Sequence, residues 1–147
     1  IAPSQEHFLS ELVKQKIGAA ADSASVDEIK KESWLLFLPE NEFHEIGLLF
    51  AKFLLIKNGF EVVYLGANVP YGSLLELAEK KHIDNLFFFS VSNTSKSNLD
   101  FTINYLNKSF SKAKHFLVAN SLDINFLTKD HDITILDNLD DFVKIIS

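Results

Sequence analysis

The stretch Leu86-Phe87-Phe88-Phe89 decides the fold of this chain. Successive side chains of a β-strand point to opposite faces of the sheet, so an unbroken run of large apolar residues fills both faces. A strand that is apolar on both faces is buried between helices, as in a parallel α/β sheet. We therefore expect this run to be a central strand with helices above and below it.

Short apolar runs alternate with amphipathic stretches on both sides of this strand. The predicted strands are residues 34–38, 60–65, 85–90, 115–119 and 133–136. The predicted helices are residues 45–57, 71–81, 97–110, 122–129 and 139–146. Right-handed crossovers cover both faces of such a sheet when its strands take the order 2-1-3-4-5. The predicted fold class is α/β, with a flavodoxin-like, doubly wound parallel sheet of five strands.

The composition fits one domain of this kind and argues against several classes. The chain has 147 residues, of which 47% are hydrophobic, enough for one sizeable core. It has no cysteine, so a metal must be held by His, Asp or Glu. The net charge of −6 and the lack of arginine argue against nucleic-acid binding by these residues. No stretch resembles a signal peptide or a membrane span, so we expect a cytoplasmic protein without a membrane partner.

The N-terminal segment has the spacing of a separate amphipathic helix. Apolar residues recur every three or four positions from Pro3-Ser4 to Ile17, and small polar residues occupy positions 22–25. The first pattern predicts a helix and the second a hinge. We expect residues 1–25 to form a helix plus linker and residues 26–147 to form the α/β domain.

The histidines are divided between the two edges of the predicted sheet. Ligands of a doubly wound sheet bind beyond the carboxyl ends of its strands. His82, His115 and His131 lie at or before strand starts, at the opposite edge, where we expect solvated loop histidines. His44 is placed in a loop that leaves the carboxyl end of a strand. The sequence does not fix where His7, on the N-terminal helix, lies.

Two neighbours make His44 a candidate metal ligand. Glu42 is placed to accept a hydrogen bond from one ring nitrogen, which would raise the basicity of the other. Gly47 falls in the first turn of a helix, where glycine costs about 1 kcal/mol relative to alanine, unless something approaches the backbone closely. The alternative is that Glu40, Glu42 and Glu45 form an acidic helix start and that His44 is merely solvated.

Two further segments are expected at the same edge. Leu65-Gly66-Ala67-Asn68-Val69-Pro70 is predicted as the loop after the second strand, and Ser90-Val91-Ser92 ends the third. The serine hydroxyls are equally compatible with ligand binding and with helix capping. The first loop, Pro39-Glu40-Asn41-Glu42, is acidic and lacks glycine, which excludes a dinucleotide or flavin phosphate site. A receiver domain needs an aspartate where Ser90 or Ser92 stands.

In order and spacing, three motifs resemble the cobalamin-binding domain of corrinoid proteins. They are Glu42-x-His44-x-x-Gly47, Leu65-Gly66-x-x-x-Pro70 and Ser90-x-Ser92. Corrinoid enzymes and methyl carriers usually have aspartate at the first position. Glu42 is more similar to the sensor domain of MerR-type regulators related to light-dependent carotenoid repressors. Glu6-His7 is similar to a step in the last helix of the bundle that caps the cofactor in those regulators.

The resemblance implies a role for each matching residue. His44 would bind the cobalt of cobalamin from below, with Glu42 behind it, in place of the dimethylbenzimidazole base. The freed nucleotide tail would lie between the sheet and the neighbouring helices, with Ser90 hydrogen-bonding its base. Gly66 and Pro70 would shape the loop beside the corrin ring. The cofactor would be adenosylcobalamin or methylcobalamin, and the adenosyl form would make such a regulator a photoreceptor.

The resemblance also implies partners beyond this chain. A DNA-binding winged helix and most of the helical cap would lie upstream, so DNA would be bound through that upstream domain. A regulator of this kind is expected to be a homo-oligomer.

One departure concerns the nucleotide tail, because Ala119-Asn120 stands where the family usually has Gly-Gly. Three hypotheses remain open. The chain is a cobalamin sensor domain of a transcriptional regulator, or a corrinoid carrier or subunit of a methyltransferase or mutase. The third is a cofactor-free regulatory domain that keeps the fold, which the departure favours. The sequence offers no convincing pair of nucleophile and base, so we expect no independent catalysis.

Overall fold

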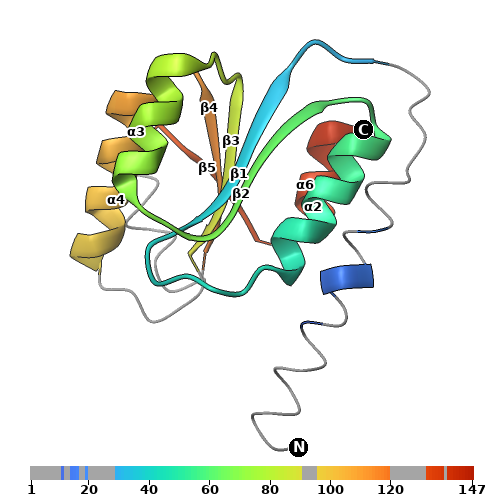
Figure 1. Cartoon of the computed structure of the whole chain (residues 1–147), viewed down its shortest axis with the longest axis horizontal. Helices are drawn as coiled ribbons and strands as arrows, with labels where there is room; N and C mark the ends of the chain where they lie inside the picture. The colour runs from blue at the N-terminus through green and yellow to red at the C-terminus, as the bar shows by residue number, and fades with distance from the viewer. Residues whose placement is uncertain are drawn as a thin grey trace, which may run out of the picture.

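A five-stranded parallel sheet forms the centre of the molecule (Figure 1). The computed structural model describes residues 29–90, 96–119, 132–137 and 139–147, together with residues 11, 14–16 and 19. The strands are β1 (Ser33–Pro39), β2 (Glu61–Val69), β3 (Asn85–Ser90), β4 (Lys114–Ala119) and β5 (Thr134–Leu136). The helices are α2 (Ile46–Lys57), α3 (Tyr71–Lys80), α4 (Lys96–Ser109) and α6 (Leu139–Ile146). The strand order is β2-β1-β3-β4-β5, which confirms the prediction.

The sheet separates two hydrophobic cores. Helices α3 and α4 cover one face, and α2 and α6 cover the other (Figure 1). Strands β1 and β3 are buried along their whole length, as the apolar run in β3 predicts. Alternate residues of β3 therefore enter different cores: Leu86 and Phe88 pack towards α3 and α4, whereas Phe87 and Phe89 pack towards α2 and α6.

The predicted boundaries of these elements agree with the observed ones to within one residue, except that β2 ends later than expected. The prediction that residues 65–70 form a loop was wrong, because β2 pairs with β1 as far as the register Pro39↔Val69. The pairing is irregular on both sides of Phe37, where β2 has more residues than β1. Such bulges bend and twist a strand. Gly66, with a φ of 83°, lies within this irregular part.

Several predictions concern residues outside the described ranges, or only partly inside them. The predicted helix over residues 122–129 lies outside them. Within the N-terminal segment, residues 11, 14–16 and 19 are helical. No helix among the described residues is long and apolar enough to cross a membrane.

The prediction that His115 is a solvated loop residue was wrong. Its side chain is 5% exposed inside β4, and its Nε2 lies 3.0 Å from the carbonyl oxygen of Phe110. His82 is exposed, as predicted, and its Nε2 lies 2.9 Å from Asp84 Oδ1. His131 lies outside the described residues. Burial holds the pKa of His115 below its ordinary value.

We predict that His115 makes the fold sensitive to mild acid. Its pKa is lowered in the folded state from 6.5, so the unfolded chain takes up the proton first as the pH falls. Stability should be full above about pH 6.5 and decline below it, until the pH passes the folded-state pKa. Urea unfolding at several pH values measures this decline. It should shrink in His115→Gln and persist in His82→Gln; an equal decline in His115→Gln would contradict the assignment.

Gly47 lies in the first turn of α2, directly against β3. A Cβ atom added there would lie 2.8 Å from Cε2 and 3.0 Å from Cζ of Phe89. These distances are shorter than van der Waals contact. The sequence suggested that some group approaches the backbone at Gly47 closely, and in this structure that group is the Phe89 ring of the protein itself.

We predict that Gly47→Ala destabilises the fold, by roughly 1–3 kcal/mol, because the methyl group overpacks the core against Phe89. The matched control is Gly72→Ala in α3, where an added Cβ meets no atom within 4 Å. That substitution should be neutral or stabilise by up to about 1 kcal/mol, because it restricts the unfolded chain. Urea unfolding of both variants measures the difference. Equal stabilities would show that the Phe89 ring can move away at little cost.

Candidate functional site

The loop between β1 and α2 carries His44 and is fastened to β2 before the histidine. The backbone N–H of Asn68 donates to the carbonyl oxygen of Glu42 at 2.9 Å. The backbone N–H of Asn41 donates to the side-chain Oδ1 of Asn68 at 3.0 Å. Asn41 and Asn68 have φ values of 69° and 53°, a region that asparagine adopts more readily than most residues. These bonds fix the path of the loop just before His44.

A second contact with β2 fixes the loop after the histidine. The hydroxyl of Tyr64 donates to Oε2 of Glu45 at 3.0 Å. Burial, and then the Glu45 carboxylate, raise the pKa of Tyr64, so the phenol keeps its proton. The ammonium of Lys52 lies over the same ring, 5.3 Å from its centroid. His44 is therefore flanked on both sides by residues that are bonded to β2.

His44 itself is exposed at the carboxyl edge of the sheet, the edge predicted from the sequence. Three large apolar side chains are also exposed. Phe43 and Ile46, close to His44 in the sequence, are 60% and 38% exposed, and Leu65, on β2, is 37% exposed. Among the described residues, no three His, Asp or Glu side chains converge to hold a metal. The described residues around His44 thus suit a metal that brings most of its other ligands with it, as haem iron does.

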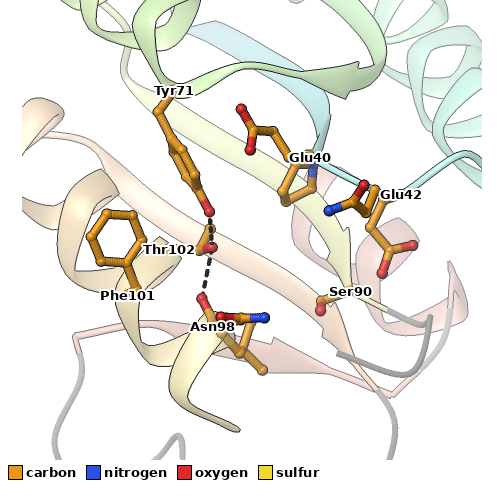
Figure 2. Close-up of a pocket in the computed structure, with 10 residues that line it drawn as sticks. Glu40, Glu42, Tyr71, Ser90, Asn98, Phe101 and Thr102 are labelled. Carbon is orange, nitrogen blue, oxygen red and sulfur yellow. Dashed lines mark hydrogen bonds between the residues drawn. The ribbon is translucent and has the colours of Figure 1, made fainter. Parts of the chain in front are cut away.

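A cavity of about 400 Å³ lies at the same edge, between the ends of β1 and β3 and the starts of α3 and α4. Figure 2 shows Glu40, Glu42 and Ser90 on one side, and Tyr71, Thr102 and Asn98 on the other. The Thr102 hydroxyl donates to the Asn98 carbonyl at 3.0 Å, so the Tyr71 hydroxyl donates to Thr102. The complete lining is Pro39, Glu40, Asn41, Glu42, Tyr71, Ser90, Asn98, Leu99, Phe101 and Thr102.

Two buried polar side chains line this cavity. Glu42 is 2% exposed and Ser90 is 8% exposed. The Ser90 hydroxyl makes no hydrogen bond within the part of the chain that the structure describes. Because Ser90 lines the cavity, its hydroxyl is placed to bond a polar ligand or a water molecule there.

The structure places the predicted site residues in several different positions. Glu42 and Ser90 line the cavity, whereas His44 is not part of its lining. Leu65 and Gly66 lie in the irregular part of β2, and Pro70 precedes α3 as its N-cap residue. Ser92, Glu6 and His7 lie outside the described residues.

Sequence reasoning missed several residues that build this edge. Asn68 lies in the part of β2 that was not predicted, whereas Tyr64 lies in the predicted strand but its contact with Glu45 was not anticipated. Tyr71 and Thr102 are brought together from α3 and α4. Their pairing has no local signal in the sequence, because it depends on how the two helices pack.

The strand order and the edge geometry define a flavodoxin-like α/β domain with a cavity beyond the carboxyl ends of its strands. No protein-family model matches the chain, and no curated protein sequence does. Solved structures do match it.

A cobalamin-binding protein from Desulfitobacterium hafniense superposes with a TM-score of 0.61 at 21% identity, over 97% of this chain and 71% of that one. The monomethylamine corrinoid protein of Methanosarcina barkeri gives 0.60 at 18% identity, over 92% and 62%. The methanol:cobalamin methyltransferase complex of the same organism gives 0.67 at 21% identity, over 84% and 48%. At these identities the likeness shows the fold, which is shared with corrinoid proteins.

We predict that the Asn68 side chain limits the opening of the His44 loop. Asn68→Gly keeps the positive φ but removes the acceptor for the Asn41 N–H. One such hydrogen bond contributes about 0.5–1.5 kcal/mol, so hydrogen exchange at the Asn41 amide should accelerate by roughly three- to tenfold. The control is Asn104→Ala, which removes an exposed side-chain bond to Asp100. Unchanged exchange in Asn68→Gly would show that the loop is held by other contacts.

Proposed function

We propose that this chain is a corrinoid-binding domain in which His44 is the lower ligand of cobalt. The observation that carries the proposal is an exposed imidazole at the carboxyl edge of the sheet, on a loop bonded to β2 on both sides. The solved structures with this fold include proteins described as cobalamin-binding or corrinoid proteins, which supports the same cofactor class.

The residues at this edge fit the macrocycle. A corrin ring supplies the equatorial ligands of its cobalt, so the protein needs to add one axial nitrogen, and His44 offers one. The exposed side chains of Phe43, Ile46 and Leu65 provide apolar surface for a flat ring. When bound, adenosylcobalamin or methylcobalamin would supply a reactive cobalt–carbon bond.

The protein's own residues would orient the ligand. Asn68 and Tyr64 hold the two flanks of the His44 loop, which limits the directions in which the imidazole can point. A ligand held on a restrained loop loses less conformational freedom when it binds. We propose no catalytic role for these residues, so the chemistry would belong to the cofactor or to a partner.

Two biological roles fit such a domain. The first is the sensor domain of a MerR-type regulator, which the Glu42 motif and the Glu6-His7 step favour. The second is a corrinoid carrier, favoured by two solved neighbours that are described as a methylamine corrinoid protein and a methyltransferase complex.

Light would separate these two roles. A sensor that uses adenosylcobalamin should change its oligomeric state after illumination, and a DNA-binding segment should lie upstream in the same polypeptide. A carrier should instead accept a methyl group from a partner methyltransferase, with no change of size in light. Size-exclusion chromatography of the full-length protein, loaded in the dark and then illuminated, measures the first property.

We predict that His44→Ala weakens binding of methylcobinamide by at least tenfold, because the only protein ligand of cobalt is lost. In methylcobinamide the methyl group occupies the upper position, so an imidazole can enter only from below. The measurement is a visible absorption titration in the dark. His82→Ala, which removes an exposed histidine at the opposite edge, is the matched control and should bind as the wild type does. Equal affinity in His44→Ala, or no binding by the wild type, would contradict the proposed function.

A further inference from the structure

We propose that this domain prefers corrinoids that lack the nucleotide tail. The inference rests on the proposed function and concerns the fate of that tail. In cobalamin the tail ends in a base that occupies the lower position of cobalt. If His44 takes this position, the base must leave the metal, and the tail must lie elsewhere. Exchanging the base for His44 replaces one cobalt–nitrogen bond with another, but the base is tethered to the corrin and competes with His44 at high effective concentration. Cobalamin would therefore bind as tightly as a corrinoid without the tail only if the released tail gains a binding site of its own.

Among the residues that the structure describes, the face of the sheet beside α2 is closely packed. At the start of α2, the ring of Phe89 fills the space next to Gly47, with Cε2 only 2.8 Å from where a Cβ atom would stand. Deeper in the same layer, the rings of Phe87 and Phe142 stack with centroids 4.5 Å apart. Trp34 stacks on Phe116 at 5.3 Å. A core packed in this way has no room for a planar base unless side chains move.

The face beside α3 and α4 has space but the wrong charge. The cavity of about 400 Å³ is large enough for a planar base, and the unpartnered hydroxyl of Ser90 would suit one. Its walls also carry Glu40 and Glu42, and no lysine is among the described residues that line it (Figure 2). The base is joined to the corrin through a phosphodiester, whose negative charge the Glu40 carboxylate repels.

Ala119, at a position where the family usually has glycine, lies on the same face. Ala119 pairs with Ser90 across β3 and β4, and it belongs to the hydrophobic core beneath α3 and α4. Its methyl group takes space that glycine would leave free. As far as the described residues go, both faces are therefore unfavourable for the tail, which would remain in solvent at this edge.

The test compares two ligands that differ only in the nucleotide tail, methylcobalamin and methylcobinamide. The wild-type chain is titrated with each in the dark, and binding is followed by visible absorption. We expect methylcobinamide to bind at least tenfold more tightly. Methylcobalamin binding as tightly or more tightly would overturn the inference while leaving the proposed function intact. Failure of both ligands to bind would refute the proposed function itself, and the inference with it.

A second comparison tests whether Phe89 closes the α2 face. Phe89→Leu shortens the side chain beside Gly47, and the affinity ratio should move towards methylcobalamin by threefold or more. Phe88→Leu is the matched control, because it changes the same residue type in the same strand but on the opposite face. Its ratio should stay at the wild-type value. Circular dichroism identifies any variant that fails to fold. An unchanged ratio in folded Phe89→Leu would contradict the role given to this ring.

Discussion

The geometry of the candidate site depends on the hydrogen bonds that join Asn68 to the loop between β1 and α2. The Asn68 backbone binds the carbonyl of Glu42, and its side chain receives the N–H of Asn41. These bonds need β2 to continue through its irregularly paired part, because Asn68 lies there, between the pairs Phe37↔Gly66 and Pro39↔Val69. The irregular end of β2 thus determines the position of the loop that carries His44.

A second constraint acts inside the fold. The pair Gly47 and Phe89 brings α2 close to β3, and the aromatic layer below it is densely packed. The edge of the sheet is accessible around His44, but the interior beside α2 is filled. This combination suits a ligand that rests on the edge better than one that penetrates between sheet and helix. It also gives Gly47 a structural role that is independent of any cofactor.

The sheet could be predicted because its signals are local. The apolar run in β3 identified the central strand, and alternation of strands and helices gave the order that the structure shows. The position of His44 at the carboxyl edge followed from that topology. The end of β2 could not be predicted, because Gly66 within a bulge has the same appearance in sequence as a glycine that ends a strand.

The candidate site was predicted only in part, for similar reasons. Glu42 and Ser90 were singled out individually, but their shared cavity depends on how α3 and α4 pack over the sheet.

Electron paramagnetic resonance of the chain with cob(II)inamide tests the central claim most directly. This corrinoid has no base of its own, so an axial nitrogen can come only from the protein or the buffer. If His44 ligates cobalt, the spectrum should show a nitrogen splitting into triplets, which becomes doublets when the histidines carry ¹⁵N and disappears in His44→Ala. A bound corrinoid without this splitting, or with a splitting that survives in His44→Ala, would contradict the account.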